Sequence, residues 1–208
     1  MSNTLYYAHD PMCSWCWGFR PVWERLQTRL PAEVQVRPIL GGLAADSDQP
    51  MAPDMQSRLQ DTWRRIEQRI PGTRFNFAFW ETCSPRRSTY PACRAVIAAR
   101  MQRPGQESNL VLAIQRAYYE QARNPSDHTT LVELAGELGL DPRRFSSDLA
   151  APATQAALER DIAHSRTLGL TGFPSLLLDV NGSRWPVPVN YTDHHPMLEH
   201  IRILLEMD

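Results

Sequence analysis

Two cysteines three positions apart offer the clearest chemistry in this sequence. Cys13 and Cys16 stand in the segment Met12-Cys13-Ser14-Trp15-Cys16-Trp17-Gly18, after a short apolar run at residues 5–8. From residue 19 onward apolar side chains recur every three or four positions, which predicts a helix. The free N–H groups and the dipole at the start of such a helix stabilise a thiolate, which is the nucleophile of thiol–disulfide exchange. The pair is therefore predicted to be a redox dithiol, in which Cys13 attacks and Cys16 resolves.

A second motif lies far away in the sequence. Thr171-Gly172-Phe173-Pro174-Ser175 leads directly into an apolar run at residues 176–180. Proline cannot donate to a sheet ladder and therefore fits the start of a strand. An X-Pro bond can also adopt the cis form in a tight turn. Alone this motif is weak evidence, but it gains weight beside a strand, a CxxC segment and a helix.

Residues 10–19 and 172–175 together resemble the DsbA-type branch of the thioredoxin superfamily. They are most similar to members without a secretory signal that are predicted protein-disulfide isomerases. The resemblance covers essentially the whole chain and implies a thiol–disulfide oxidoreductase. It also implies that Phe173 offers backbone groups to a substrate strand and that Pro174, in cis, lies against the cysteine pair. Ser14 and Trp15 occupy positions that tune the stability of the thiolate. Trp17 either joins Trp15 in an apolar rim for substrate or packs structurally.

The order of predicted elements is that of an α/β thioredoxin fold, βαβ…αββα, interrupted by a large all-helical insertion. Residues 1–42 and 153–208 are expected to form the thioredoxin-like domain, and residues 43–152 the inserted helical domain. Strands are predicted at residues 5–8, 34–40, 176–180 and 185–189. Helices are predicted at residues 19–30, 55–70, 91–101, 106–123, 129–138 and 153–168, after Asp141, and from Asp193 onward. Asn181-Gly182 indicates a hairpin, and Pro186 and Pro188 place the returning strand at an edge.

An aromatic segment carries Phe75, Phe77 and Phe79 at alternating positions, which predicts a short extended piece. These rings either line a groove near the dithiol or form the core of the helical insertion. Cys83 and Cys93 make a second pair, which is either a disulfide or two reduced thiols. Structural zinc sites usually need two close ligand pairs, and only one close cysteine pair exists, so no metal is predicted.

The composition weighs against several classes of partner. The 208 residues carry 22 basic side chains, all arginine, and 23 acidic ones, for a net charge of −1. That balance argues against electrostatic capture of nucleic acid or of anionic membranes. No run of about 18 apolar residues predicts a membrane span. The first residues lack the basic and apolar parts of a signal peptide, so the expected location is the cytoplasm, where a CxxC pair is more often catalytic than structural.

One departure from the resembled family concerns proton transfer. Several family members carry a buried carboxylate six residues before the first cysteine, and here that position is Tyr7. His9 and Asp10 are nearby candidates for proton transfer, and a charged His9 would stabilise the thiolate. No bound cofactor is predicted, with glutathione as a candidate co-substrate. The expected partners are protein thiols and disulfides or glutathione, together with an unidentified redox partner.

Two other functions compete with the redox interpretation. Kappa-type glutathione transferases and 2-hydroxychromene-2-carboxylate isomerase resemble this fold, including its helical insertion, but use a serine where Cys13 stands. The presence of both cysteines favours redox chemistry. A peptide-binding adaptor without turnover is the third interpretation, and its mark would be a peptide that binds without thiol exchange. The direction of the redox reaction stays open, because reductases, oxidases and isomerases use the same two sulfurs.

Overall fold

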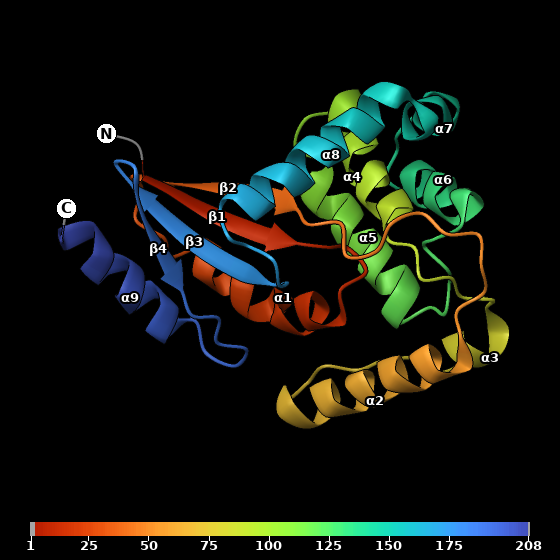
Figure 1. Ribbon diagram of the computed structural model, residues 1–208, viewed down its shortest axis with the longest axis horizontal. Helices are drawn as coiled ribbons and strands as arrows, with labels where there is room; N and C mark the ends of the chain where they lie inside the picture. The colour runs from red at the N-terminus through yellow and green to blue at the C-terminus, as the bar shows by residue number, and fades with distance from the viewer. Residues whose placement is uncertain (1–2, 208) are drawn as a thin grey trace.

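Four strands form one mixed sheet in the computed structural model, which describes residues 3–207 (Figure 1). The strands are β1 (Asn3–His9), β2 (Val34–Leu40), β3 (Ser175–Val180) and β4 (Ser183–Val187), in the order β2-β1-β3-β4. β1 pairs in parallel with β2 and antiparallel with β3, and β3 pairs antiparallel with β4. This arrangement, with a helical insertion between β2 and β3, is the predicted thioredoxin fold.

Helices cover both faces of the sheet because its strands are apolar on both sides. α1 (Ser14–Gln27) and α9 (His195–Glu206) lie on one face, and α8 (Pro152–Thr167) approaches the other (Figure 1). The alternation of strand side chains assigns them to the two layers. Leu176 and Leu178 join the core under α1 and α9, whereas Leu177 between them joins Ala8 and Ile39 on the opposite face.

Within the described residues, seven helices lie between β2 and β3. They are α2 (Pro53–Arg69), α3 (Phe79–Thr82), α4 (Tyr90–Gln102), α5 (Glu107–Tyr119), α6 (His128–Glu137), α7 (Pro142–Ala150) and α8. Four of them contact α4, whereas α2 packs against α1. α4 is buried along most of its length, and its many alanines allow α5, α6, α7 and α8 to contact it. α8 contacts both α4 and β2, so it joins the helical region to the sheet. The domain boundary predicted near residue 153 stays a prediction.

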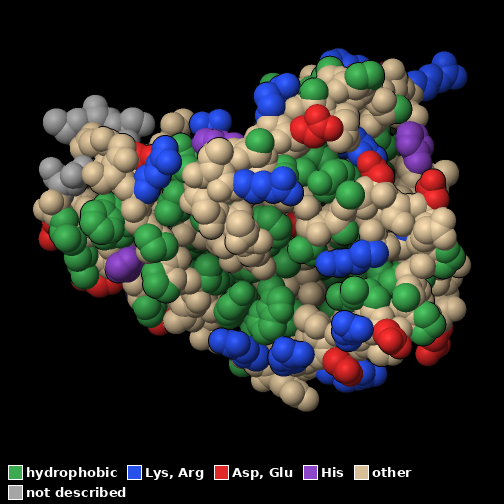
Figure 2. Space-filling model, viewed as in Figure 1, with side chains coloured by type: hydrophobic (Ala, Val, Ile, Leu, Met, Phe, Trp, Pro, Cys, Tyr) green, Lys and Arg blue, Asp and Glu red, His purple; other side chains and the backbone are tan. Residues whose placement is uncertain are grey.

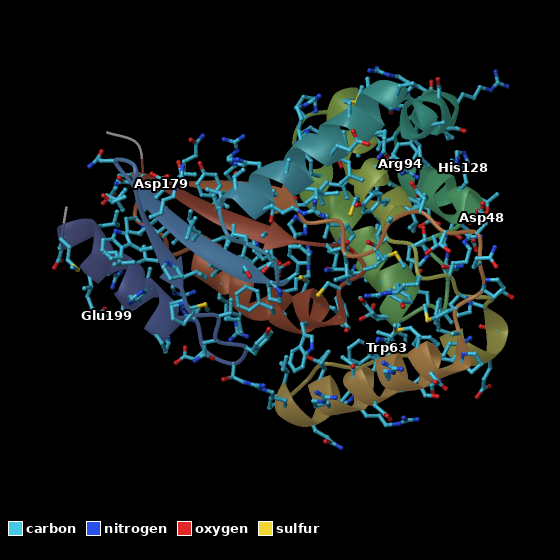
Figure 3. All side chains as sticks on the ribbon, viewed as in Figure 1. Asp48, Trp63, Arg94, His128, Asp179 and Glu199 are labelled. Atoms are coloured by element: carbon cyan, nitrogen blue, oxygen red, sulfur yellow. The ribbon has the colours of Figure 1, made fainter. Side chains whose placement is uncertain are left out.

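The predicted extended piece at Phe75, Phe77 and Phe79 is wrong, because Phe75 and Phe77 lie in a loop and Phe79 begins α3. The three rings gather instead around Trp63, on the face of α2 that is turned toward the other helices (Figure 3). The Trp63 and Phe75 rings stack with centroids 4.9 Å apart. The cluster is therefore the core of the helical region, and its alternating pattern reflects a loop wrapped around one tryptophan.

The predicted bounds of the last strand also need correction. β4 begins at Ser183, two residues earlier than predicted, and ends before Pro188. Asn181 and Gly182 both have positive φ, at 51° and 96°, so the turn needs only these two residues and pairing resumes at once between Val180 and Ser183. The prediction that this strand lies at an edge is confirmed. Within residues 3–207, no helix combines the length and the apolar character that crossing a membrane requires.

Candidate active site

Cys13 stands at the junction between β1 and α1. It is the N-terminal cap residue of α1, with extended backbone angles, and its side chain makes no capping hydrogen bond. Its N–H donates to the Asp10 carbonyl at 3.0 Å, which closes the loop that leads from the strand into the helix. The Cys13 thiol, whose residue is only 6% exposed, donates to the carbonyl of Phe173 at 3.3 Å. The two motifs singled out in the sequence therefore meet at one sulfur.

The peptide bond between Phe173 and Pro174 is cis, as predicted. The Phe173 ring packs directly against the backbone of Gly41, where a Cβ atom would lie 1.9 Å from the ring. The N–H of Gly41, just beyond the end of β2, in turn donates at 2.8 Å to the carbonyl of His9, the last residue of β1. With its ring held on Gly41, Phe173 presents its backbone carbonyl to Cys13.

Cys16 lies one turn along α1 and is fully buried. Burial, and then the neighbouring Cys13, raise the pKa of the Cys16 thiol well above its ordinary value. Tyr7 stands beside it, and burial followed by the charges of the two cysteines raises the pKa of the Tyr7 hydroxyl well above its ordinary value. A cavity of about 490 Å³ opens behind the dithiol and is lined by Tyr7, His9, Cys16 and Arg20 among others. Cys16 is thus a buried, protonated thiol that borders this cavity.

His9 does not meet the condition under which it would stabilise a thiolate. Burial, and then the positive charge of Arg20, lower the pKa of His9 to about 4, so the imidazole is neutral near pH 7. Its ring stacks on Tyr7 with centroids 4.8 Å apart, and Tyr7 packs on Trp23 at 4.3 Å. The hypothesis that a charged His9 stabilises the Cys13 thiolate is therefore wrong, since burial keeps the imidazole neutral. The sequence alone does not reveal how deeply this ring is buried.

Asp10 is fully buried and ties the CxxC loop to two other segments. One carboxylate oxygen accepts the Met12 N–H at 2.8 Å, and the other accepts the Leu43 N–H and the Thr89 hydroxyl, each at 2.7 Å. Burial raises the pKa of Asp10, while these donors counteract the rise. Four donors, including the Cys93 thiol at 3.5 Å, thus engage the carboxylate. Asp10 positions the loop, and its side chain forms no hydrogen bond to Cys16.

The second pair of cysteines has separate partners. Cys93 donates to Asp10, whereas the Cys83 thiol donates to the carbonyl of Ala122 at 3.1 Å. Among residues 3–207, which include all four cysteines, no disulfide is formed. The interpretation of Cys83 and Cys93 as two thiols therefore fits the structure.

Replacing Thr89 by valine is expected to destabilise the fold by about 2 kcal/mol, because a buried acceptor and a buried donor each lose a partner. The Thr89 hydroxyl donates to Asp10 and also accepts the N–H of Ala44 at 3.0 Å. Urea unfolding followed by tryptophan fluorescence measures the change. Thr62→Val, which removes an exposed hydroxyl bonded to the Arg58 carbonyl in α2, is the matched control. Equal stability of the two variants would contradict the proposed anchoring of the loop.

The two tryptophans of the motif have different surroundings. The indole N–H of Trp17 donates to the Arg74 carbonyl at 3.2 Å, and its ring stacks on Tyr119 at 5.8 Å. Trp17 therefore packs against the helical region. Of the two roles considered for it, a substrate rim or structural packing, this contact fits structural packing. Trp15 packs instead on Tyr191, with ring centroids 5.1 Å apart. No pattern in the sequence marked Tyr191, which lies in the loop after β4, although it lies close to both cysteines.

Ser14 begins α1 and is buried between the two cysteines. Ser14 and Trp15 are the two residues predicted to tune the stability of the thiolate. Ser14 is buried, whereas Trp15 lies at the partly exposed rim of the site. Their effect on the potential stays a prediction.

The fold and the dithiol define a protein with the architecture of a DsbA-like thiol–disulfide oxidoreductase. The model of the DSBA-like thioredoxin domain matches residues 6–191. The chain therefore belongs to the DSBA-like thioredoxin domain family.

Solved structures agree with this assignment. A protein from Nitrosomonas europaea, provisionally described as a protein disulfide isomerase, superposes with a TM-score of 0.85 at 26% identity and covers 100% of this chain and 99% of its own. DsbM from Pseudomonas aeruginosa, described as a cytosolic disulfide reductase, gives a TM-score of 0.76 at 25% identity, with coverages of 99% and 100%. DsbM has also been solved with glutathione.

Curated relatives point to a different role. The ClpXP adapter protein SpxH from Halalkalibacterium halodurans is 25% identical over 207 residues, which are 98% of this chain. The chain spans 67% of the length of that protein and 56% of the length of SpxH from Bacillus subtilis. The chain is thus similar both to a protein named as a disulfide reductase and to proteins named as adapters.

Proposed function

We propose that this protein is a thiol–disulfide oxidoreductase that uses Cys13 and Cys16 to exchange disulfides with protein or small thiol substrates. One observation carries the proposal. The Cys13 sulfur lies at the start of α1, 3.3 Å from the carbonyl of Phe173, with the buried Cys16 one turn behind it. This arrangement supports the roles proposed for Cys13 as nucleophile, Cys16 as resolving thiol and Phe173 as a backbone partner for substrate.

In the reducing direction, the thiolate of Cys13 attacks one sulfur of a substrate disulfide. A bond forms between Cys13 and that sulfur, and the other substrate sulfur leaves as a thiolate that takes up a proton. The thiolate of Cys16 then attacks the Cys13 sulfur and releases the first substrate sulfur as a thiol. Two electrons pass from the dithiol to the substrate, and a disulfide between Cys13 and Cys16 remains. The reverse sequence oxidises a substrate dithiol.

Cys16 must lose its proton before it can resolve the mixed disulfide, because its pKa is raised by burial. We infer that this proton leaves through the cavity that Cys16 and His9 both line, with the neutral imidazole of His9 as a relay toward solvent. The Asp10 carboxylate, in contrast, is engaged by four donors. The Tyr7 ring stacks on the imidazole, and Tyr7 stands beside Cys16.

Glutathione is the proposed small thiol for regenerating the enzyme in the cytoplasm. Two glutathione molecules would reduce the disulfide of Cys13 and Cys16 and leave as glutathione disulfide. The description of DsbM as cytosolic, and its structure with glutathione, support both proposals. Substrate peptides would pair with the backbone of Phe173 as an added strand.

The redox equilibrium of the dithiol in a glutathione series tests the proposal. Tryptophan fluorescence should follow a two-electron transition, because Trp15 lies between the two cysteines in the sequence. Its midpoint would distinguish a reductase from an oxidase. Saturable binding of glutathione with no transition would contradict the redox proposal and favour a transferase or isomerase.

A second candidate function is that of an adapter, which the SpxH relatives favour. An adapter would bind a partner linked to ClpXP without consuming thiols. Binding of ClpX to the wild type and to a Cys13→Ser/Cys16→Ser double variant separates the two functions. Equal, saturable binding by both would support an adapter, whereas no binding by either would exclude it.

A further inference from the structure

Arg69, near the end of α2, reaches across to the rim of the dithiol site. Its guanidinium lies 5.6 Å from the ring centre of Trp15 and 5.7 Å from that of Tyr191. These two rings pack on each other and are partly exposed, while Arg69 is exposed. Arg69, from the helical region, thus forms one surface with Trp15 and Tyr191, and Trp15 is only two residues from Cys13 in the sequence.

Tyr191 connects this surface to the reacting sulfurs. Burial, and then the charges of Cys13 and Cys16, raise the pKa of its hydroxyl to about 12, while Arg69 acts in the opposite direction. Tyr191 therefore lies within electrostatic reach of both thiols and of the guanidinium. A substrate whose sulfur meets Cys13 would have neighbouring residues within reach of Arg69.

The guanidinium of Arg69 has no partner for its N–H groups among the residues that the structure describes. Its neighbour Glu67 is engaged with the N–H of Phe75 at 2.9 Å, and Asp193 near Tyr191 pairs with His195 at 2.8 Å. A guanidinium that lies over aromatic rings without hydrogen-bonding to them keeps its N–H groups available to bind a carboxylate with two hydrogen bonds. Arginine side chains also border the hydrophobic patch on this face, over α2 (Figure 2).

We propose that Arg69 is a specificity residue that selects protein substrates with an acidic side chain close to the reacting cysteine. This inference rests on the proposed oxidoreductase function and names its substrate class. An extended substrate paired with Phe173 advances about 3.3 Å per residue, so a glutamate one or two positions from the cysteine lies within reach of the rim. The apolar body of the substrate would contact Trp15 and Tyr191, and its carboxylate would meet Arg69.

Two peptides that differ only in glutamate or glutamine on both sides of one cysteine test the inference. Each peptide carries its cysteine as a disulfide with 2-mercaptoethanol, and the rate constant for reduction by the protein is divided by that for dithiothreitol, which removes intrinsic reactivity. The wild type is expected to prefer the glutamate peptide about fivefold, the size of a favourable partly exposed ion pair. Added salt should reduce the preference.

Variants locate the effect. Arg69→Gln should bring the ratio close to one, and Arg69→Glu should invert it. Arg64→Gln is the matched control, because Arg64 lies on the same helix 5.3 Å from the ring centre of Phe77 and pairs with Asp61. It should keep the wild-type preference.

The outcomes separate the inference from the function on which it rests. Reduction of both peptides at equal normalised rates by the wild type overturns the inference and leaves the oxidoreductase function standing. Reduction of neither peptide overturns that function and the inference with it. A loss confined to glutathione disulfide in Arg69→Gln, with the peptide ratio intact, would assign Arg69 to a small thiol and overturn the choice of a protein substrate.

Discussion

Replacing Cys13 by serine should abolish thiol–disulfide exchange, leaving only the uncatalysed rate. A serine hydroxyl at the start of α1 can accept the helix N–H groups, but it cannot form or break a sulfur–sulfur bond. The volume changes little at a site that is 6% exposed, so the fold should persist. Reduction of a protein disulfide by the variant, followed by thiol titration, measures the loss.

The other cysteines provide the comparison for this variant. Cys83→Ser should keep exchange activity, because the Cys83 thiol contacts the carbonyl of Ala122 and lies outside the CxxC loop. Exchange activity that survived in Cys13→Ser but vanished in Cys83→Ser would place the nucleophile elsewhere and refute the proposed site.

Between pH 6.5 and pH 4 the protein should lose up to about 3 kcal/mol of folding free energy through His9 alone, since each unit of pKa shift corresponds to about 1.4 kcal/mol. The pKa of His9 is lowered in the folded state, so the unfolded chain binds more protons over this range. Stability from the neutral imidazole is therefore complete above pH 6.5 and decreases as the pH falls toward 4.

His9→Gln should remove this part of the acid sensitivity, measured by urea unfolding at a series of pH values. His128→Gln is the control, because His128 is exposed on the helical region, where its ring bonds the Ser146 hydroxyl at 2.8 Å (Figure 3). A wild type and a His9→Gln variant with parallel stability curves would show that His9 is not buried as a neutral ring. The same variant should also release substrate from the mixed disulfide more slowly, because the Cys16 proton loses the relay that His9 provides along the cavity.

The parts of the site that the sequence predicted are those that local patterns determine. The CxxC segment needs only a strand before it and a helix after it, and both follow from periodicity over a few residues. Phe173-Pro174 lies 160 residues from Cys13, yet the resemblance to a known family brought the two together. The fold class followed from the same information, because the order of strands and helices allows few sheet topologies.

The parts that were missed depend on burial and on contacts between distant segments. Asp10 is a positioning residue because Leu43 and Thr89 converge on it, and nothing near Asp10 in the sequence indicates that convergence. The neutral state of His9 depends on its burial beside Arg20. Arg69 and Tyr191 meet at the rim only because the helical region folds back over α1. Each case required tertiary structure.

Trapping the mixed disulfide would show whether Cys13 is the nucleophile and Cys16 the resolving thiol. A Cys16→Ser variant keeps the nucleophile but cannot resolve the intermediate, so a substrate disulfide should leave a covalent adduct on Cys13. Intact-mass measurement and peptide mapping would find one adduct per chain on Cys13, and none in the Cys13→Ser/Cys16→Ser double variant. An adduct on Cys83 or Cys93, or no adduct while the wild type remains active, would contradict the account.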